Sequence, residues 1–125
     1  MVHSEQERAV AKRLEVTFFR LATGKEPVRE WLLSLDKQDR QILGDDIRTV
    51  EFGWPLGMPT CRPLTDGLWE VRSSLSHGRI ARVVFGIVDG EMILLTGFIK
   101  KTQATPSDQV KIARQRLKEY KEQQR

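Results

Sequence analysis

The sequence predicts a single α+β domain in which a helical hairpin and a C-terminal helix pack on a small antiparallel sheet. Its 125 residues are enough for one hydrophobic core. Apolar residues recur at helical spacing over residues 27–53 and 106–120, whereas residues 68–100 alternate with a period of two. We expect the domain to span residues 1–125 and the helices to cover one face of the sheet.

The first section of the chain predicts an arm followed by a strand. Residues 1–13 are polar and show no apolar stripe, so we expect an N-terminal arm or a short helix there. Residues 14–19, with the sequence LEVTFF, are rich in β-branched and aromatic side chains. This composition is typical of a strand.

Two helices joined by a short connection are predicted next. Pro27 suits the first turn of a helix, Asp36 can cap the second helix, and Gly53 stands where a C-terminal glycine belongs. The apolar stripes consist of Val28, Trp31, Leu32 and Leu35 in the first helix and of Ile42, Leu43, Ile47 and Val50 in the second. Residues 53–63 contain two glycines and three prolines, which predicts a loop.

Three antiparallel strands follow from the change to alternating residues. The segment LWEVRSSL is followed by a turn at SHGR and by the segment RIARVVFGIV. Asp89 and Gly90 form a hairpin signal before EMILLTGFIKK, the last predicted strand. Thr105 as N-cap and Pro106 at the first position open the final helix, whose apolar side consists of Val110, Ala113, Leu117 and Tyr120.

Composition limits the class of protein. No segment approaches the roughly 20 apolar residues of a membrane span, and the first residues lack the apolar centre of a signal peptide. Cys61 is the only cysteine, which excludes a disulfide framework within the chain and makes a cytoplasmic location the expectation. We expect Cys61 to be a buried thiol.

The net charge of +4 is unevenly distributed. Residues 25–59 carry five basic and seven acidic side chains, whereas residues 60–101 carry six and four and residues 102–125 carry six and three. This asymmetry favours a polyanionic partner on one side of the molecule. A solvated surface of high isoelectric point is the alternative.

Arginines cluster in the predicted strands. Glu70 and Arg72 project from one face of their strand, and Arg82 can meet Arg72 from the neighbouring strand. Lys100 and Lys101 end the third strand. Guanidinium and ammonium groups gathered in this way can bind the phosphates of RNA. Surface arginines that only pair with Glu70 are the structural alternative.

Such a cluster can also support cleavage of RNA. The 2′-hydroxyl of RNA is an internal nucleophile, so the protein has to move protons and stabilise the charge that develops on the phosphate. The sequence contains none of the usual metal-binding motifs, and a metal-free mechanism is therefore consistent with it. We expect no metal site and no cofactor.

The segments RPLTDGLWEVR, GRIARVVFGI and ILLTGFIKKTQATP, together with KEPVREWLLSL and the helix beginning near IARQR, resemble the RelE/HigB superfamily of bacterial toxins. The similarity is strongest to the phage-derived HigB-like branch and extends over roughly residues 14–120. It implies a RelE-like α+β fold and an mRNA interferase that cleaves mRNA in the ribosomal A site. It also implies a helix-turn-helix antitoxin as the partner.

The resemblance further implies the residues of the site. The catalytic candidates are Arg72, Arg82, Lys100 and Lys101, and Glu70 and Arg79 are RNA-binding candidates. Arg114 is a further RNA-binding candidate, not from the resemblance but from the basic character of the C-terminal helix. Some relatives use a histidine or tyrosine near the end of the chain to transfer protons, but no histidine stands there in this sequence.

The identity of the groups that transfer protons stays open. We expect Tyr120 to be a packing residue and His77 to lie on the surface of a turn, which leaves the two lysines as the best candidates for general acid and base. Two other classes also remain open. One is a toxin that binds DNA gyrase without cutting RNA, and the other is an inactive relative that only binds its antitoxin.

Overall fold

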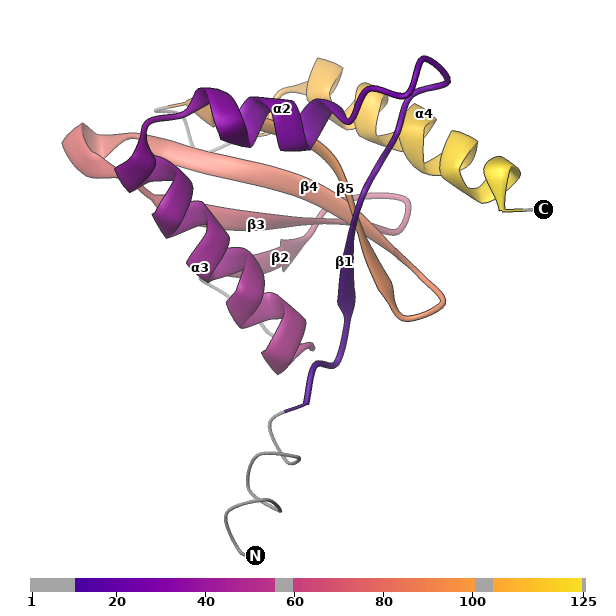
Figure 1. Cartoon of the computed structure of the whole chain (residues 1–125), viewed down its shortest axis with the longest axis horizontal. Coiled ribbons are helices and arrows are strands. Elements are labelled where there is room, and N and C mark those ends of the chain that lie inside the picture. Colours follow the sequence, from indigo (N-terminus) through magenta and orange to yellow (C-terminus); the bar gives the residue numbers. More distant parts are fainter. Residues whose placement is uncertain (1–10, 56–59, 101–104, 125) are drawn as a thin grey trace, which may run out of the picture.

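The computed structural model describes residues 11–55, 60–100 and 105–124, the side chain of Lys100 excepted (Figure 1). Within them, five strands form one sheet of order β1-β5-β4-β3-β2, and three α-helices pack on it. The strands are β1 (Glu15–Phe18), β2 (Cys61–Pro63), β3 (Leu68–Ser74), β4 (Ile80–Val88) and β5 (Glu91–Lys100). The helices are α2 (Pro27–Ser34), α3 (Lys37–Gly53) and α4 (Ser107–Gln123), with a short 3₁₀ turn, η1 (Ser76–Gly78).

The predicted α+β class and the run of three antiparallel strands are confirmed. Strands β3, β4 and β5 pair in chain order, and a register shift between Val84 and Phe85 marks a bulge. Asp89 and Gly90 have φ angles of 50° and 78°, as a tight hairpin of this type requires. The period of two in the sequence therefore located this part of the sheet correctly.

The sheet is mixed and not wholly antiparallel as predicted, because β1 pairs in parallel with the outer edge of β5. A second difference is β2, which lies in the segment predicted to be a loop and pairs with β3. The pairing of β1 with β5 joins segments far apart in the chain, so it leaves no local signal in either segment. Pro63 is tolerated because β2 is an edge strand.

Helices cover both faces of the sheet, whereas the sequence predicted one covered face. Helices α2 and α3 pack on one face, and α4 packs on the other. The reason lies in the central strands, where consecutive residues are all buried although they face opposite sides. Met92 and Leu94 face α2 and α3, and Ile93 and Leu95 face α4. A strand that is apolar on both sides requires cover on both sides.

Two of the three helices, α2 and α3, begin where local signals predict. Helix α2 begins at Pro27, and the Asp36 side chain accepts a hydrogen bond from the backbone N–H of Asp39 at 2.9 Å. Thr105 does not cap α4 as predicted. The helix begins at Ser107 with Pro106 as N-cap, and the Thr105 hydroxyl donates to a carboxylate of the sheet instead.

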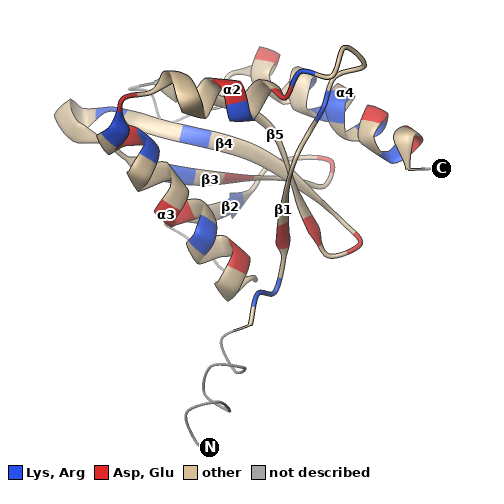
Figure 2. Ribbon diagram, in the orientation of Figure 1, with Lys and Arg blue, Asp and Glu red and all other residues tan. Residues whose placement is uncertain are grey.

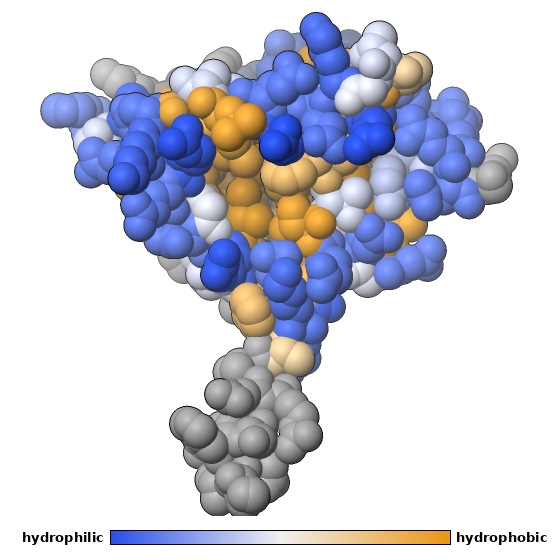
Figure 3. All heavy atoms as spheres, in the orientation of Figure 1, coloured by the Kyte–Doolittle hydropathy of each residue, from blue (hydrophilic) through white to orange (hydrophobic). Residues whose placement is uncertain are grey.

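Apolar side chains also reach the surface on the side of α2 and α3. Figure 3 shows them gathered between these helices and β1, with hydrophilic residues around them. The partly buried members of this group include Val16, Phe18, Leu32 and Leu35. Among the described helices, none has the length and apolar character that crossing a bilayer requires.

Candidate anion-binding site

Arg72 and Arg82 are direct partners across β3 and β4. Paired residues of neighbouring strands project from the same face, which here is the face of α4, because the adjacent Val84 belongs to the core that α4 covers. The register thus pairs the two arginines across neighbouring strands as predicted. Arg82 is fully buried and Arg72 is half-buried, so only Arg72 reaches solvent.

Glu70 is the centre of the cluster. Its side chain has no exposed surface, and its Oε1 accepts a hydrogen bond from Nε of Arg62 at 2.6 Å. Its second oxygen, Oε2, accepts from the Thr105 hydroxyl. Burial lowers the pKa of Arg82, Glu70 counteracts that effect, and Arg72 and Arg62 lower the pKa further. Three guanidinium groups therefore lie within electrostatic range of one carboxylate. The net charge of these four groups together is +2.

Arg62 is a site residue that the sequence analysis missed. Strand β2 places it opposite Glu70, and the β2–β3 turn contains Asp66 and Gly67 at positive φ angles of 54° and 77°. A turn of this kind in TDG, with an arginine and a glutamate eight positions apart around it, was the signal that could have revealed the pair. The interpretation of residues 53–63 as a loop concealed it.

The lysine pair is only partly within the described residues. Lys100 is the last residue of β5, and its backbone is paired with Ile80, two positions along β4 from Arg82. Its side chain and the whole of Lys101 lie outside the described residues. The register brings the end of β5 to the strand that carries Arg82, and the roles of both lysines stay predictions.

Arg79 and Arg114 make contacts elsewhere. Arg79 donates from Nη1 and Nη2 to the carboxylate of Asp39 at 2.8 and 3.1 Å, which links the start of β4 to the first turn of α3. These hydrogen bonds raise the pKa of Arg79. Arg114 donates to Asp66 at 2.8 Å in an exposed pair between α4 and the β2–β3 turn. Their binding of RNA stays a prediction.

Three other residues with reactive side chains have the surroundings that the sequence predicted: a buried thiol, a packing tyrosine and a histidine at the surface of a turn. Cys61 is fully buried, and burial together with the charge of Glu70 raises the pKa of its thiol to about 11. Tyr120 is buried against the core under α4, and burial, followed by the nearby Glu91, raises the pKa of its phenol. His77 is exposed in the turn between β3 and β4.

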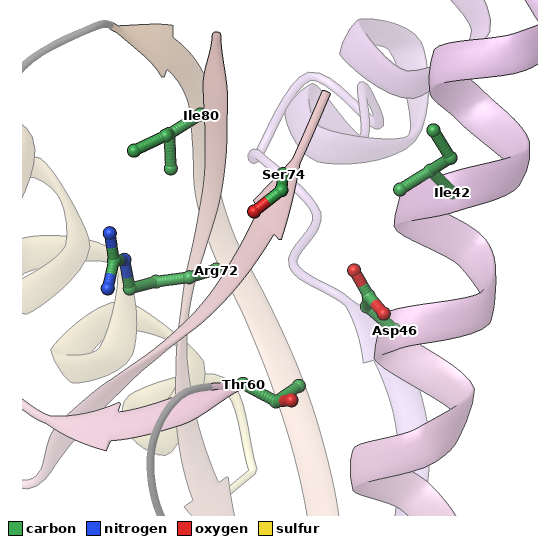
Figure 4. A pocket seen from close by; sticks show the side chains of 6 residues that line it. All are labelled: Ile42, Asp46, Thr60, Arg72, Ser74 and Ile80. Atoms are coloured by element: carbon green, nitrogen blue, oxygen red, sulfur yellow. The ribbon is translucent and has the colours of Figure 1, made fainter. Parts of the chain in front are cut away.

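A cavity of about 370 Å³ lies at the edge of β3 beside Arg72. Strand β2 ends its pairing at Val71, and the last contact is a hydrogen bond of 2.8 Å from the backbone N–H of Arg72 to the carbonyl of Thr60. Beyond it, the described strands leave this edge of β3 open. The cavity is lined by Ile42, Asp46, Thr60, Arg72, Ser74 and Ile80 (Figure 4).

The described residues include no group of three or more His, Cys, Asp and Glu side chains placed to hold a metal ion. The potential donors of the cluster are guanidinium groups and a hydroxyl, and its carboxylate is already engaged by Arg62. Chemically, the arrangement is suited to an anion.

The cluster lies within a region that matches a known protein family. The family model described as "Phage derived protein Gp49-like (DUF891)" matches residues 30–118, which include every described member of the cluster. A search of curated proteins found no match. Since the family match extends over more than two thirds of the chain, the protein belongs to the phage-derived Gp49-like family, which is part of the toxin superfamily of toxin–antitoxin systems.

Proposed function

We propose that the chain is the toxin of a type II toxin–antitoxin system and cleaves mRNA on the ribosome without a metal ion, as a HigB-like member of the RelE/HigB superfamily. The observation that supports it is the cross-strand pair of Arg72 and Arg82, held beside Arg62 by the buried Glu70. The proposed partners are a helix-turn-helix antitoxin, mRNA and the ribosomal A site, and the proposed location is the cytoplasm.

In the proposed reaction, the 2′-hydroxyl of the RNA attacks the adjacent phosphorus, and the 5′-oxygen leaves. Negative charge increases on the equatorial oxygens during attack, and fixed positive groups stabilise it. Arg72 is the arginine of the pair with exposed surface, so it is assigned the contact with the phosphate.

Arg82 has a different part in this proposal from the one the sequence suggested. A fully buried guanidinium presents no surface to a phosphate, so direct contact requires that it become exposed. We assign it a positioning role: it lies beside Arg72 on the neighbouring strand, and its charge acts through a medium of low dielectric constant, where electrostatic interactions are stronger than in water. Lys100 and Lys101 remain the proposed groups for proton transfer, because neighbouring positive charges lower the pKa of an ammonium group.

Cleavage of mRNA on programmed ribosomes, mapped by primer extension, tests the function. Wild-type protein is expected to cut at a defined position in the A-site codon and to leave a 2′,3′-cyclic phosphate. A message with a single 2′-deoxynucleotide at that position is expected to stay intact, because the nucleophile is missing. Intact ordinary message in the presence of folded wild-type protein contradicts the proposal, and DNA damage on induction under the same conditions would favour the gyrase-binding class.

Substitution of Arg72 tests the assigned contact. Arg72→Gln is expected to lower the cleavage rate by about 10²–10³-fold, as the loss of one donor to a developing oxyanion does. Arg48→Gln is the control, because Arg48 is exposed on α3, on the other side of the sheet. Equal rates for the two variants would remove Arg72 from the site.

A further inference from the structure

The cavity beside Arg72 is lined by two groups of opposite charge, the guanidinium of Arg72 and the carboxylate of Asp46. Figure 4 shows the Arg72 side chain leaving β3 in the direction away from α3, while the Asp46 carboxylate faces the strand from α3. A phosphate is attracted by the first group and repelled by the second. A ligand that carries an anion at one end and hydrogen-bond donors at the other fits this arrangement.

The other lining groups are those that a flat, polar-edged ring requires. Ile42 from α3 and Ile80 from β4 provide apolar surface, and Thr60 and Ser74 provide hydroxyl groups. A volume of about 370 Å³ lies within the range of pockets that bind small molecules. Unstacked bases of single-stranded RNA are recognised in this way, with the ring against side chains and the polar edge hydrogen-bonded.

We propose that this cavity binds one nucleobase of the RNA next to the phosphate held by Arg72, and that Asp46 selects the base. The inference rests on the proposed function, because it takes RNA as the ligand. A carboxylate only accepts hydrogen bonds, so it favours a base edge that donates. Guanine presents two adjacent donors, N1–H and the N2 amino group, and is the base that Asp46 is expected to select.

Equilibrium binding of short RNAs to the folded chain, without ribosomes, tests the pocket. The probes are fluorescein-labelled oligouridylate hexamers with U or G at the third position. Wild-type protein is expected to prefer the guanosine probe roughly tenfold, the size of discrimination that a two-bond contact to a base edge provides. Asp46→Asn is expected to abolish most of this preference, because an amide no longer presents two acceptors.

Asp45→Asn is the matched control. Asp45 is the preceding residue on the same helix, is exposed and does not line the cavity, so its substitution is expected to keep the preference. Ser74→Leu is a second, independent variant: Ser74 is exposed at the end of β3, and a larger side chain there fills the cavity and is expected to remove the preference as well.

The outcomes separate this pocket from the proposed reaction. A wild-type chain that cuts message on ribosomes but binds both probes within twofold of each other overturns the pocket and leaves the reaction standing. The same holds for a preference that persists in both Asp46→Asn and Ser74→Leu. Selective binding that Asp46→Asn removes supports the pocket, even if ribosome-bound message stays intact and the cleavage proposal fails.

Discussion

At the scale of single residues, Glu70 decides whether three arginines can lie together. Without its charge, the buried Arg82 has lost the carboxylate that counteracts its desolvation. We expect Glu70→Gln to lower the free energy of unfolding by about 3–5 kcal/mol, the cost of removing one partner of a buried ion pair. Urea unfolding followed by circular dichroism measures this change.

The matched control for Glu70 is Asp66, which also accepts from an arginine Nε. Nε of Arg62 lies 2.6 Å from Oε1 of the fully buried Glu70. Nε of Arg114 lies 2.8 Å from Oδ2 of Asp66, and both of these side chains are exposed. Asp66→Asn is expected to cost less than about 1 kcal/mol, as exposed pairs do. Similar costs for the two variants would show that the cluster does not depend on the buried charge.

Cys61 provides a prediction about pH at the same scale. Its thiol has a pKa of about 11 in the folded protein against an ordinary value of 9.0. Above pH 9 the unfolded chain loses this proton more readily than the folded chain. The contribution of the thiol to the free energy of unfolding is therefore fully present below pH 9 and is lost as pH rises from 9 to 11. The total is about 2–3 kcal/mol, since one pKa unit corresponds to about 1.4 kcal/mol.

Comparison of the wild-type protein with Cys61→Ala isolates this effect, because the substitution removes the thiol and no other ionisable group. The difference between their free energies of unfolding, measured by urea denaturation, is expected to shrink by that amount between pH 8.5 and pH 11. A constant difference over this range would mean that the thiol is not desolvated in the folded state.

At the scale of elements, the position of α2 depends on Gly97 in β5. A Cβ atom at Gly97 would overlap the indole ring of Trp31, which lies directly on the strand. We expect Gly97→Ala to cost about 1–3 kcal/mol, the usual effect of overpacking. At Gly44 in α3 an added Cβ meets nothing within 4 Å, so Gly44→Ala is expected to stabilise the protein by about 0.5–1 kcal/mol. Thermal unfolding of both variants checks the opposite signs.

At the scale of the whole molecule, local chemistry was readable from the sequence and long-range pairing was not. Alternation of residues located β3, β4 and β5, and with them the meeting of Arg72 and Arg82. Nothing local specifies that β1 pairs in parallel with β5. The same limit applies to Asp46, which shares a cavity with Arg72 only because α3 lies beside the open edge of β3. The pairing that brings Arg62 to Glu70 had a local signal in the TDG turn, but the proline- and glycine-rich segment before it predicted a loop.

The two helical layers differ in charge. Helix α3 carries three basic and four acidic side chains, a sum of −1, whereas α4 carries five basic and three acidic ones, a sum of +2 (Figure 2). The arginine pair faces the α4 side. A polyanion as large as ribosomal RNA is therefore expected to approach the face of α4.

Salt dependence of ribosome binding tests this orientation. Lys111 and Lys118 are exposed and seven positions apart on α4, so they lie on one side of the helix. Replacing both with glutamine is expected to weaken binding and to make the plot of log K against log salt less steep by about 1.4 to 1.8, because each lost phosphate contact contributes about 0.7 to 0.9. Lys37→Gln with Arg48→Gln on α3 removes the same net charge and is expected to leave the slope unchanged. Equal changes of slope for the two pairs would mean that only the total charge matters and that α4 does not face the RNA.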